Sequence, residues 1–297
     1  MKILLVGGSG TIGKHLIEDW LLAGHQVQNL SRSSMDALVT SAGSLLQQQW
    51  DGQTIPDTEF RPDLVVNLAG AGIADHAWTP DRRKLILDSR IKSTRACVEY
   101  IRKNTDSVKL FINSSAVGFY GAHREEICTE ESKPGNDFLA EVCEAWENEA
   151  KRAPVRTVLL RTSVVISKYG GALPKMLPVF KAGIGGWLGN GRQPFPWIDG
   201  REFSHLIQWL MDHPEASGPY NICSPQSINN KQFSQALSEA VHRPCLFAVP
   251  AFVLKIMLGS RADLVLKGQN QVPERLTREG YVFKYDKISE ALHFHTR

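Results

Sequence analysis

The chain opens with KILLVGGSGTIG, the run Lys2–Gly13, which reads as a strand, a glycine-rich turn and the start of a helix. Its four consecutive apolar residues, Ile3–Val6, predict a strand buried on both faces. Gly7, Gly10 and Gly13 follow at intervals of three residues. This spacing between a strand and a helix is typical of dinucleotide-binding α/β proteins. The run therefore predicts a dinucleotide site at the very start of the fold.

Each glycine of this run has a predicted task. Gly7 permits the tight turn, Gly10 lets the backbone approach a pyrophosphate, and Gly13 lets the helix pack closely. The free N–H groups at the helix start, where Thr11 and Ile12 lie, then face the anion. The alternative is a glycine-rich turn without a ligand, but the strand before it and the helix after it favour the binding site.

The end of the second predicted strand indicates which dinucleotide binds. Gln26–Leu30 is followed by Ser31 and Arg32, with no Asp or Glu among these residues. NAD-binding proteins of this class usually place an acid there for the ribose hydroxyls. Arg32 can instead hold a 2′-phosphate through charge-assisted hydrogen bonds worth roughly 1.5–3 kcal/mol, and Ser31 can add a hydroxyl donor. We predict NADP(H) as the cofactor, with an exposed loop arginine as the alternative for Arg32.

Two further segments extend the predicted cofactor site. The strand Leu64–Leu68 ends in small residues, so we expect Leu68, Ala69 and Gly70 to lie where the cofactor ribose passes. Asp51, just after a short predicted strand, either contacts the adenine or forms a turn.

Short β-rich runs alternate with amphipathic segments through the first half of the chain. The predicted strands are Lys2–Val6, Gln26–Leu30, Leu45–Trp50, Leu64–Leu68, Lys109–Asn113 and Val155–Leu160. The predicted helices are Ile12–Ala23, Pro80–Lys103, Asp137–Lys151, Lys231–Val241, Pro250–Leu258 and Asp286–Leu292. This order predicts an α/β fold, a Rossmann doubly wound parallel sheet with right-handed crossovers.

The character of the sequence changes after about Thr162. Glycines and prolines crowd residues 170–196, which predicts loops and turns. We predict a Rossmann domain over residues 1–225, with residues 163–205 contributing to a smaller substrate lobe, and a small C-terminal α/β domain over 226–297. Ligands of doubly wound sheets lie at the carboxyl ends of the strands, so the cleft is expected between the lobes.

Composition excludes several other classes. The net charge of the 297 residues is only +3, without a basic run, which argues against nucleic-acid binding. The five cysteines are scattered and lack metal-ligand spacing, which predicts reduced thiols, no metal site and a cytoplasmic location. The apolar start is too short for a signal peptide, and no apolar stretch reaches the length of a membrane span.

Later segments, together with the opening run, resemble the extended short-chain dehydrogenase/reductase superfamily. The closest similarity is to its "epimerase family protein" subgroup, atypical sugar-epimerase-like reductases with a short C-terminal domain of their own. The segments that carry the resemblance are Ser114–Gly121, Asp137–Ala140 with Trp146 and Glu147, and Gly185–Gln193 leading to Phe195–Ile198.

The resemblance implies a Tyr-x-x-x-Lys pair on one helix, in which the Lys lowers the pKa of the Tyr that exchanges a proton with substrate. The matching helix here is Asp137–Lys151. The places of Tyr and Lys hold Leu139 and Cys143, or Phe138 and Val142 in a register shifted by one residue. Neither pair can move a proton in this way. Cys143 is either a reactive thiol or, as is typical of a buried apolar face, plain packing.

Three other residues are candidates by the resemblance. Ser115 follows the fifth predicted strand, where the superfamily keeps its catalytic Ser, and it either bonds a substrate oxygen or caps the strand end. Tyr120 is the nearest tyrosine able to serve as the acid, with a cleft-wall aromatic as the alternative. Arg90 recurs in the subgroup and can reach the cofactor, unless it belongs to a solvated helix face.

Two functions remain open at this point. One is an NADP-dependent oxidoreductase or epimerase that acts on a hydroxyl or carbonyl of a small polar substrate without the usual dyad. The other is a non-catalytic NADP(H)-binding redox sensor or partner-binding module. The missing dyad favours the second and the elaborate glycine-rich loop favours the first. The resemblance also suggests a homodimer through Pro80–Lys103 and Asp137–Lys151, although the apolar stripe of the first helix is equally explained by its own sheet.

Overall fold

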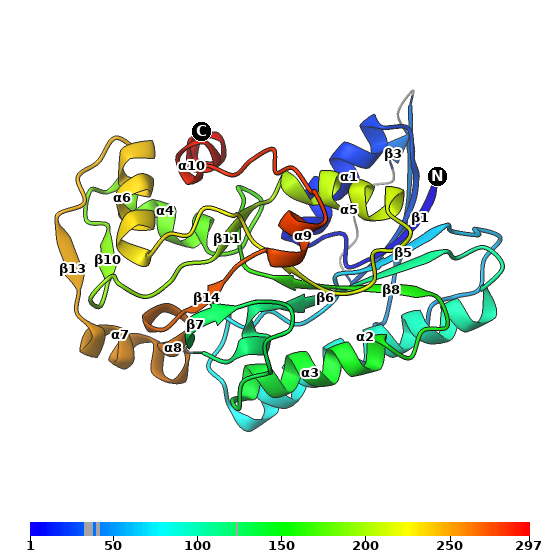
Figure 1. The fold of residues 1–297 in the computed structure, drawn as a ribbon, viewed down its shortest axis with the longest axis horizontal. Helices are drawn as coiled ribbons and strands as arrows, with labels where there is room; N and C mark the ends of the chain where they lie inside the picture. Colours follow the sequence, from blue (N-terminus) through cyan, green and yellow to red (C-terminus); the bar gives the residue numbers. More distant parts are fainter. Residues whose placement is uncertain (33–37, 40–41, 123) are drawn as a thin grey trace.

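The computed structural model describes residues 1–32, 38–39, 42–122 and 124–297. A large sheet forms its main lobe, and among the described residues this sheet has eight strands, all parallel except one at the edge (Figure 1). The strands are β1 (Lys2–Val6), β2 (Gln26–Ser31), β3 (Leu38–Val39), β4 (Ser44–Gln49), β5 (Leu64–Asn67), β6 (Leu110–Ala116), β8 (Arg156–Thr162) and β12 (Gly218–Ile222). They lie in the order β12-β8-β6-β5-β1-β2-β4-β3, and β3 is antiparallel to β4.

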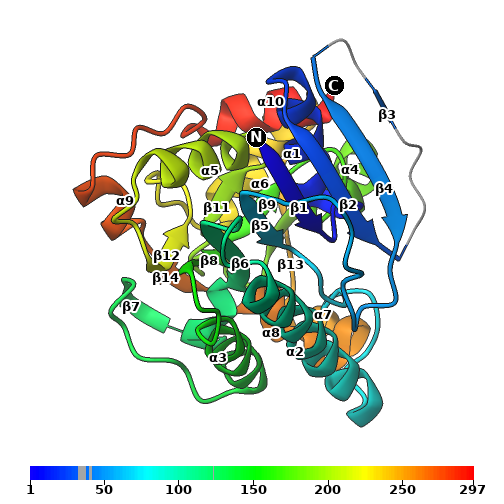
Figure 2. The same ribbon diagram turned by 90° about the vertical axis from the view of Figure 1, so that its right-hand side faces the viewer.

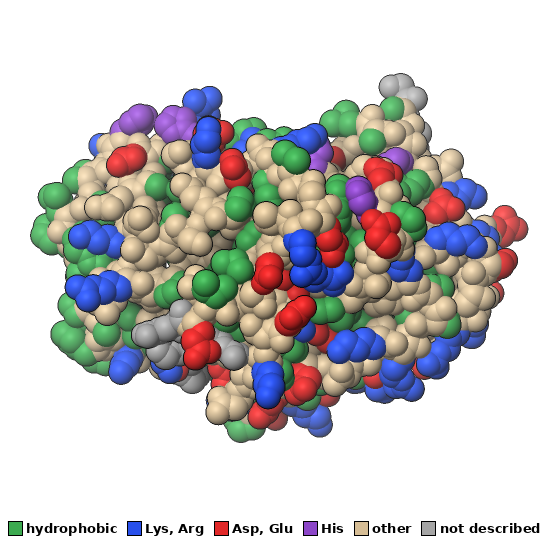
Figure 3. Space-filling view, in the orientation of Figure 1, with side chains coloured by type: hydrophobic (Ala, Val, Ile, Leu, Met, Phe, Trp, Pro, Cys, Tyr) green, Lys and Arg blue, Asp and Glu red, His purple; other side chains and the backbone are tan. Residues whose placement is uncertain are grey.

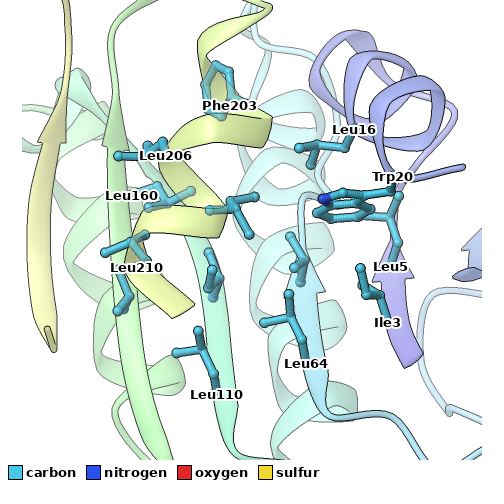
Figure 4. Close-up of a cluster of buried hydrophobic side chains, with 14 of the residues drawn as sticks. Ile3, Leu5, Leu16, Trp20, Leu64, Leu110, Leu160, Phe203, Leu206 and Leu210 are labelled. Atoms are coloured by element: carbon cyan, nitrogen blue, oxygen red, sulfur yellow. The ribbon is translucent and has the colours of Figure 1, made fainter. Parts of the chain in front are cut away.

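Helices cover both faces of this sheet. Helices α1 (Thr11–Leu22) and α5 (Glu202–Asp212) lie on one face, while α2 (Pro80–Lys103) and α3 (Phe138–Ala150) lie side by side on the other (Figures 1 and 2). Trp20 of α1 and Phe203 of α5 are buried against strand residues such as Leu64 (Figure 4). The predicted doubly wound Rossmann sheet is therefore confirmed.

All six predicted strands are present, but the sequence prediction omitted β12. Pro219 explains the omission, because proline cannot donate to a sheet ladder and is tolerated only at edges. In the structure β12 is the edge strand beside β8 and buries Tyr220 and Ile222. The strand that contains proline thus lies at the edge of the sheet, where it pairs with β8 alone.

Among the helices of eight or more residues, two were also omitted from the prediction. Helix α4 (Leu173–Lys181) lies in the segment expected to hold only loops and turns, and that expectation is wrong for these residues. Pro174 stands in its first turn, where proline is accepted, and Pro178 lies inside a helix of only 9 residues. Helix α5 buries Phe203 and Leu210, which are seven residues apart and therefore lie on one helix face. The sequence prediction missed this periodicity.

The smaller lobe is built from short elements that pair across the chain (Figure 1). Strands β10 (Gly186–Leu188) and β13 (Phe247–Val249), β9 (Val164–Ile166) and β11 (Trp197–Asp199), and β7 (Arg124–Cys128) and β14 (Gln269–Gln271) form three parallel pairs. Its helices are α4, α6 (Asn230–Ala240), α7 (Ala251–Leu258), α8 (Asp263–Leu266) and α10 (Ile288–Thr296), with a 3₁₀ turn at Gly259–Arg261. Helix α9 (Glu274–Arg278) packs on β12 of the main sheet, and the 3₁₀ turn at Val117–Tyr120 packs on α3.

Residues 226–297 complete elements that begin earlier in the chain. Strand β13 pairs with β10 and β14 pairs with β7, while Phe233 of α6 and Leu292 of α10 share a core with Phe180 and Trp197. The last quarter of the chain is therefore fixed to the earlier residues by both strand pairing and side-chain packing.

The surface carries charges of both signs intermixed, and apolar side chains gather at the end of the molecule formed by β13 and α7 (Figure 3). Phe247, Phe252 and Ile256 are exposed there. Across the described ranges, no helix has the length and apolar character needed to cross a membrane.

Candidate functional site

The glycine-rich turn closes tightly around its own backbone. Gly7 has φ +90°, and a Cβ there would lie 2.9 Å from the Ala69 nitrogen. A Cβ on Gly13 would overlap the backbone of Gly8. The amide of Gly8 donates to Asn29 Oδ1 at 2.9 Å, which fixes the turn against β2. Because side chains are excluded at these positions, the backbone itself lines the space above the turn.

The first turn of α1 opens onto that space. Gly10 is the N-cap, and no side chain caps the helix. The first N–H groups of a helix have no acceptor within it, and they carry the positive end of the helix dipole. Thr11, Ile12 and Gly13 line a cavity together with Gly7 and Gly10. The arrangement suits an anion such as a pyrophosphate.

The two residues at the end of β2 differ in placement. Ser31 is buried, and its hydroxyl accepts from Gln47 Nε2 at 3.0 Å within the β2–β4 pair. Arg32 is exposed, and within the described part of the chain no ion pair involves it. Leu30 O accepts from Gly7 N at 2.8 Å, which fixes the end of β2 beside the glycine-rich turn. Arg32 follows two residues later and is not among the residues that line the cavity. The geometry leaves Arg32, rather than Ser31, available to an added phosphate.

Asp51 serves a turn. Its Oδ1 accepts from the amides of Gln53 at 2.8 Å and Thr54 at 3.2 Å. These bonds lower the pKa of Asp51. Of the two interpretations of this residue, the structure supports the turn.

Arg90 lies over the loop that follows β5. Its guanidinium packs against Gly70, where a Cβ would lie 3.1 Å from Arg90 Cζ. Arg90 Nη1 donates to Ala71 O and to Ile86 O, both at 3.0 Å, and the group lies 5.0 Å from the ring of Trp146. Burial lowers its pKa, and no carboxylate among the described residues pairs with it. Arg90 and Leu68 line the cavity, whereas Ala69 and Gly70 shape the loop beside it.

Ser115 does not face the cavity, which corrects the expected placement. Its hydroxyl donates to Glu147 Oε1 at 2.7 Å, beneath α3. Successive residues of a strand point to opposite faces, and the neighbours Ser114 and Ala116 line the cavity instead. No hydrogen-bond partner of the Ser114 hydroxyl occurs among the described residues. The strand end that the resemblance indicated reaches the cavity, but the side chain of Ser115 lies on the other face of the strand.

Tyr120 is likewise buried away from the cavity. Its hydroxyl donates to Asn221 Oδ1 at 2.6 Å and accepts from Arg161 Nη1 at 3.1 Å. Burial raises its pKa well above the ordinary value. This environment opposes proton transfer to a ligand, so the geometry does not support the predicted role of Tyr120 as the acid.

A buried ion pair explains why Ser115 and Tyr120 are engaged. Arg161 of β8 binds Glu147 of α3 through Nε at 2.8 Å and Nη2 at 3.0 Å, and both side chains are almost fully buried. Phe119 stacks on the guanidinium at 3.5 Å. The pair joins α3 to the sheet and takes up both predicted catalytic hydroxyls.

The positions of the usual dyad do line the cavity. Leu139, Val142 and Cys143 of α3 face it. Burial raises the pKa of the Cys143 thiol to about 12, although Arg90 opposes the shift. The thiol therefore stays protonated near neutral pH. Among the described lining residues there is no Tyr and no His.

The second lobe supplies the opposite wall, as the expected cleft between the lobes requires, but the sequence did not indicate which of its residues line the cavity. Its apolar lining residues include Met176, Leu188, Phe195, Leu258, Leu264 and Val265. Its polar lining residues are Gln193, Asn230, Arg261, Asp263, Lys267 and Gln269. They come from segments that are far apart in the sequence, so only the folded chain brings them together. The whole cavity measures about 570 Å³.

A family model describes residues 3–223 of this chain, from the glycine-rich turn through β12. The chain belongs to the NAD dependent epimerase/dehydratase family. A second model, a domain of unknown function (DUF1731), matches residues 249–294, which hold α7, α8, α9 and most of α10. The family assignment covers both the glycine-rich turn and the positions of the missing dyad.

Relatives within the epimerase/dehydratase family match the chain along its whole length. "Epimerase family protein YfhF" of Bacillus subtilis is 34% identical over 98% of this chain and 97% of its own. The chloroplastic "epimerase family protein SDR39U1 homolog" of Arabidopsis thaliana is 33% identical over 98% and 86%. The crystal structure of human epimerase family protein SDR39U1 (isoform 2) with NADPH has a TM-score of 0.88 and 28% identity, over 100% and 99% of the two chains. The subgroup inferred from the sequence is confirmed.

Proposed function

We propose that this member of the epimerase/dehydratase family binds NADP(H) in the cavity and acts as an oxidoreductase on a carbonyl or hydroxyl group. The observation that carries the proposal is a cavity that begins at the glycine-rich turn and ends at the second lobe. Its volume, about 570 Å³, lies within the range of roughly 300–1,000 Å³ typical of ligand sites. The human relative whose structure includes NADPH supports the same cofactor.

The residues present fit this cofactor. The open amides at Thr11–Gly13 suit the pyrophosphate, and the exposed Arg32 suits the 2′-phosphate. Arg90, which has no carboxylate partner in the described part of the chain, places positive charge at the cavity wall. When bound, the cofactor would supply hydride to a carbonyl carbon, and the carbonyl oxygen would then need a proton.

Ser114 is the residue best placed to hold the substrate oxygen. It lines the cavity at the carboxyl end of β6, and its hydroxyl is not engaged by the described residues. A hydroxyl can donate to a carbonyl oxygen and stabilise the charge that develops there. Because no Tyr or His lines the cavity among the described residues, we assign the proton itself to solvent.

Two measurements test the proposal. Calorimetry with NADPH and NADH should show binding with a clear preference for NADPH. A screen of carbonyl compounds should then show consumption of NADPH, and Ser114→Ala should lower turnover more than Ser115→Ala does. Failure to bind NADPH would remove the proposal altogether.

The second candidate function is a non-catalytic NADP(H)-binding module. The observation that favours it is the apolar surface of Leu139, Val142 and Cys143 at the place of the dyad. Tight NADPH binding without turnover across a broad carbonyl screen would support this alternative over the oxidoreductase.

Assembly and location remain proposals as well. A homodimer through α2 and α3 is proposed by resemblance, while the buried stripe of α2 packs on its own sheet through residues such as Val98 and Ile101. All five cysteines are free thiols, which supports a reducing compartment such as the cytoplasm. Sedimentation of the purified protein tests the dimer.

A further inference from the structure

The cavity wall that the second lobe forms contains two side-chain amides, and both of them bond to the backbone of Leu188. Gln193 Nε2 donates to Leu188 O at 3.1 Å, and Asn230 Oδ1 accepts from Leu188 N at 2.7 Å. The backbones of the two residues also meet, because Asn230 N donates to Gln193 O at 3.0 Å. The two amides are therefore fixed side by side, one from the loop after β10 and one from the first turn of α6.

The hydrogen bonds of Gln193 define which end of its amide is unused. Nε2 donates to Leu188 O and also to Val265 O at 2.8 Å, so both of its protons are engaged. This settles the orientation of the amide. Its Oε1 is buried and has no donor among the described residues. Buried acceptors are nearly always bonded, so an unmet one on a residue that lines the cavity points to a ligand donor.

Asn230 offers the complementary group. The side chain is buried, with 3% exposed, and the residue lines the cavity. Its Oδ1 must be the atom that faces Leu188 N–H, since only the oxygen can accept. Nδ2 then remains as a donor without a partner in the described residues. An acceptor and a donor thus stand together on one wall.

The surroundings of this pair are apolar. Leu188, Phe195, Leu264 and Val265 line the same wall. Of the charged residues there, Lys267 is paired with Asp263 at 2.9 Å. Arg261 donates to Ala74 O at 2.9 Å and is the single lining cation of this lobe without a described carboxylate partner. One such cation is a poor match for the diphosphate of a sugar nucleotide, which usually needs several.

We propose that Gln193 and Asn230 select the substrate, and that this substrate is a largely apolar carbonyl compound carrying one hydrogen-bond donor next to one acceptor. Gln193 Oε1 accepts from an N–H or O–H of the substrate, and Asn230 Nδ2 donates to its adjacent oxygen. Amides and hydroxy-carbonyl compounds have this pattern. The inference rests on the proposed function, because it specifies the substrate class of the same cavity.

Two variants remove one half of the pair each. Asn230→Asp keeps an oxygen for Leu188 N–H but replaces the free donor with an acceptor, and a negative charge in the first turn of a helix is tolerated. Gln193→Met removes the free acceptor with little change of volume, and with it the two Nε2 hydrogen bonds to Leu188 O and Val265 O, so NADPH affinity of this variant serves as the check that the cavity is intact. The control is Asn229→Asp, which adds the same charge one residue away at the N-cap, where the side chain accepts from Gln232 N at 2.9 Å.

The probes are matched pairs in which a methyl group replaces the donor hydrogen: isatin with N-methylisatin, and α-hydroxyacetophenone with α-methoxyacetophenone. Their affinities are measured by calorimetry on the full-length protein saturated with NADP⁺. The wild-type protein should bind the donor-bearing member about tenfold more tightly, the usual effect of one hydrogen bond to a buried group. Gln193→Met should abolish that preference. Asn230→Asp should weaken binding of the donor-bearing probes about tenfold, and Asn229→Asp should leave it unchanged.

Equal affinity within both pairs, or no binding of any probe by the wild-type complex, would overturn the inference. It would also be overturned if Asn229→Asp weakened binding as much as Asn230→Asp, since charge alone would then explain the loss. NADPH affinity is measured in parallel on the same samples. If the wild-type protein does not bind NADPH, the proposed function fails; if it does and the probes are not discriminated, only the substrate assignment fails.

Discussion

The two walls of the cavity are built in opposite ways. The wall at the glycine-rich turn is made of backbone from one continuous run, Gly7–Gly13, with almost no side chain involved. The wall of the second lobe is made of side chains from distant positions such as Gln193, Asn230 and Lys267. A wall of backbone amides can bind a part that many ligands share, such as a phosphate. A wall of placed side chains can distinguish one ligand from another.

The largest effect is expected from closing the backbone wall. In Gly13→Ala the new Cβ would overlap the backbone of Gly8, which has no flexible side chain to yield. The turn must open, and the amides that face the phosphates move with it. We expect NADPH affinity to fall at least about a hundredfold, the loss of two or more charge-assisted hydrogen bonds, as measured by calorimetry.

Gly52→Ala is the control for that change. Gly52 has φ +88°, but a Cβ there meets nothing within 4 Å and the residue lies outside the cavity. Its substitution should cost about 1 kcal/mol of stability through backbone strain while NADPH binding stays intact. A similar loss of binding in both variants would mean that stability, and not the turn, governs the affinity.

The wall at the glycine-rich turn could be predicted from the sequence, whereas the residues of the second-lobe wall could not. A strand, three glycines and a helix are adjacent in sequence, so their geometry follows from the order of residues. Gln193 and Asn230 meet because both side chains bond to Leu188 and because Asn230 N bonds to Gln193 O, contacts that exist only in the folded chain. Nothing in the sequence near either residue reports that meeting.

The end of β6 shows where prediction from family resemblance fails. The resemblance selected Ser115, but the pleat turns it to Glu147 and presents Ser114 to the cavity. A shift of one residue reverses the face of a strand, and family position alone did not fix that register. Arg161, which binds Glu147 and Tyr120, was not singled out because a buried arginine in a strand has no local sequence signal.

The next largest effect is expected from Arg32, at the end of β2, and concerns the preference for NADPH over NADH. Arg32→Ala removes the exposed guanidinium at the end of β2. Because charge-assisted bonds to a phosphate are worth roughly 1.5–3 kcal/mol, the ratio of NADPH to NADH affinity should fall about tenfold to hundredfold. NADH affinity itself should stay nearly constant. An unchanged ratio would show that Arg32 is only a surface residue, and calorimetry with both cofactors makes the measurement.

A smaller effect is expected where α1 meets the second lobe, outside the cavity lining. His15 of α1 bonds through Nε2 to Ser167 Oγ at 2.8 Å, and its ring centre lies 5.6 Å from that of His295. His295 Nε2 is in turn 3.0 Å from Asp199 Oδ1. Burial, followed by the neighbouring His295, lowers the pKa of His15 from 6.5 to about 4, and the opposing charges of Asp199 and Glu18 only moderate the shift. The folded state therefore holds His15 neutral.

The direction of the pH effect follows from this lowered pKa. Above about pH 6.5 neither state binds the proton, so stability from this group is complete; between pH 6.5 and about 4 the unfolded state binds it first and stability falls. We expect the melting temperature to drop over this window, by about 2–4 °C for each kcal/mol lost. His15→Gln should reduce the drop, whereas exposed His293→Gln should not. Equal profiles for His15→Gln and the wild-type protein would contradict the assignment.

The smallest effect is expected at the former place of the dyad lysine. Cys143 lines the cavity, and a thiol with a pKa of about 12 is neither a base nor a nucleophile near neutral pH. Cys143→Ala should therefore leave NADPH affinity and any turnover within about twofold, and cost about 1 kcal/mol of stability for the buried sulfur removed. Iodoacetamide at pH 8 should not modify Cys143 in the folded protein, as peptide mass spectrometry would measure. Rapid alkylation of Cys143, or a loss of turnover much greater than twofold, would instead show that this thiol takes part in the reaction. The place of the dyad would then no longer be an inert apolar surface opposite the polar side chains of the second lobe.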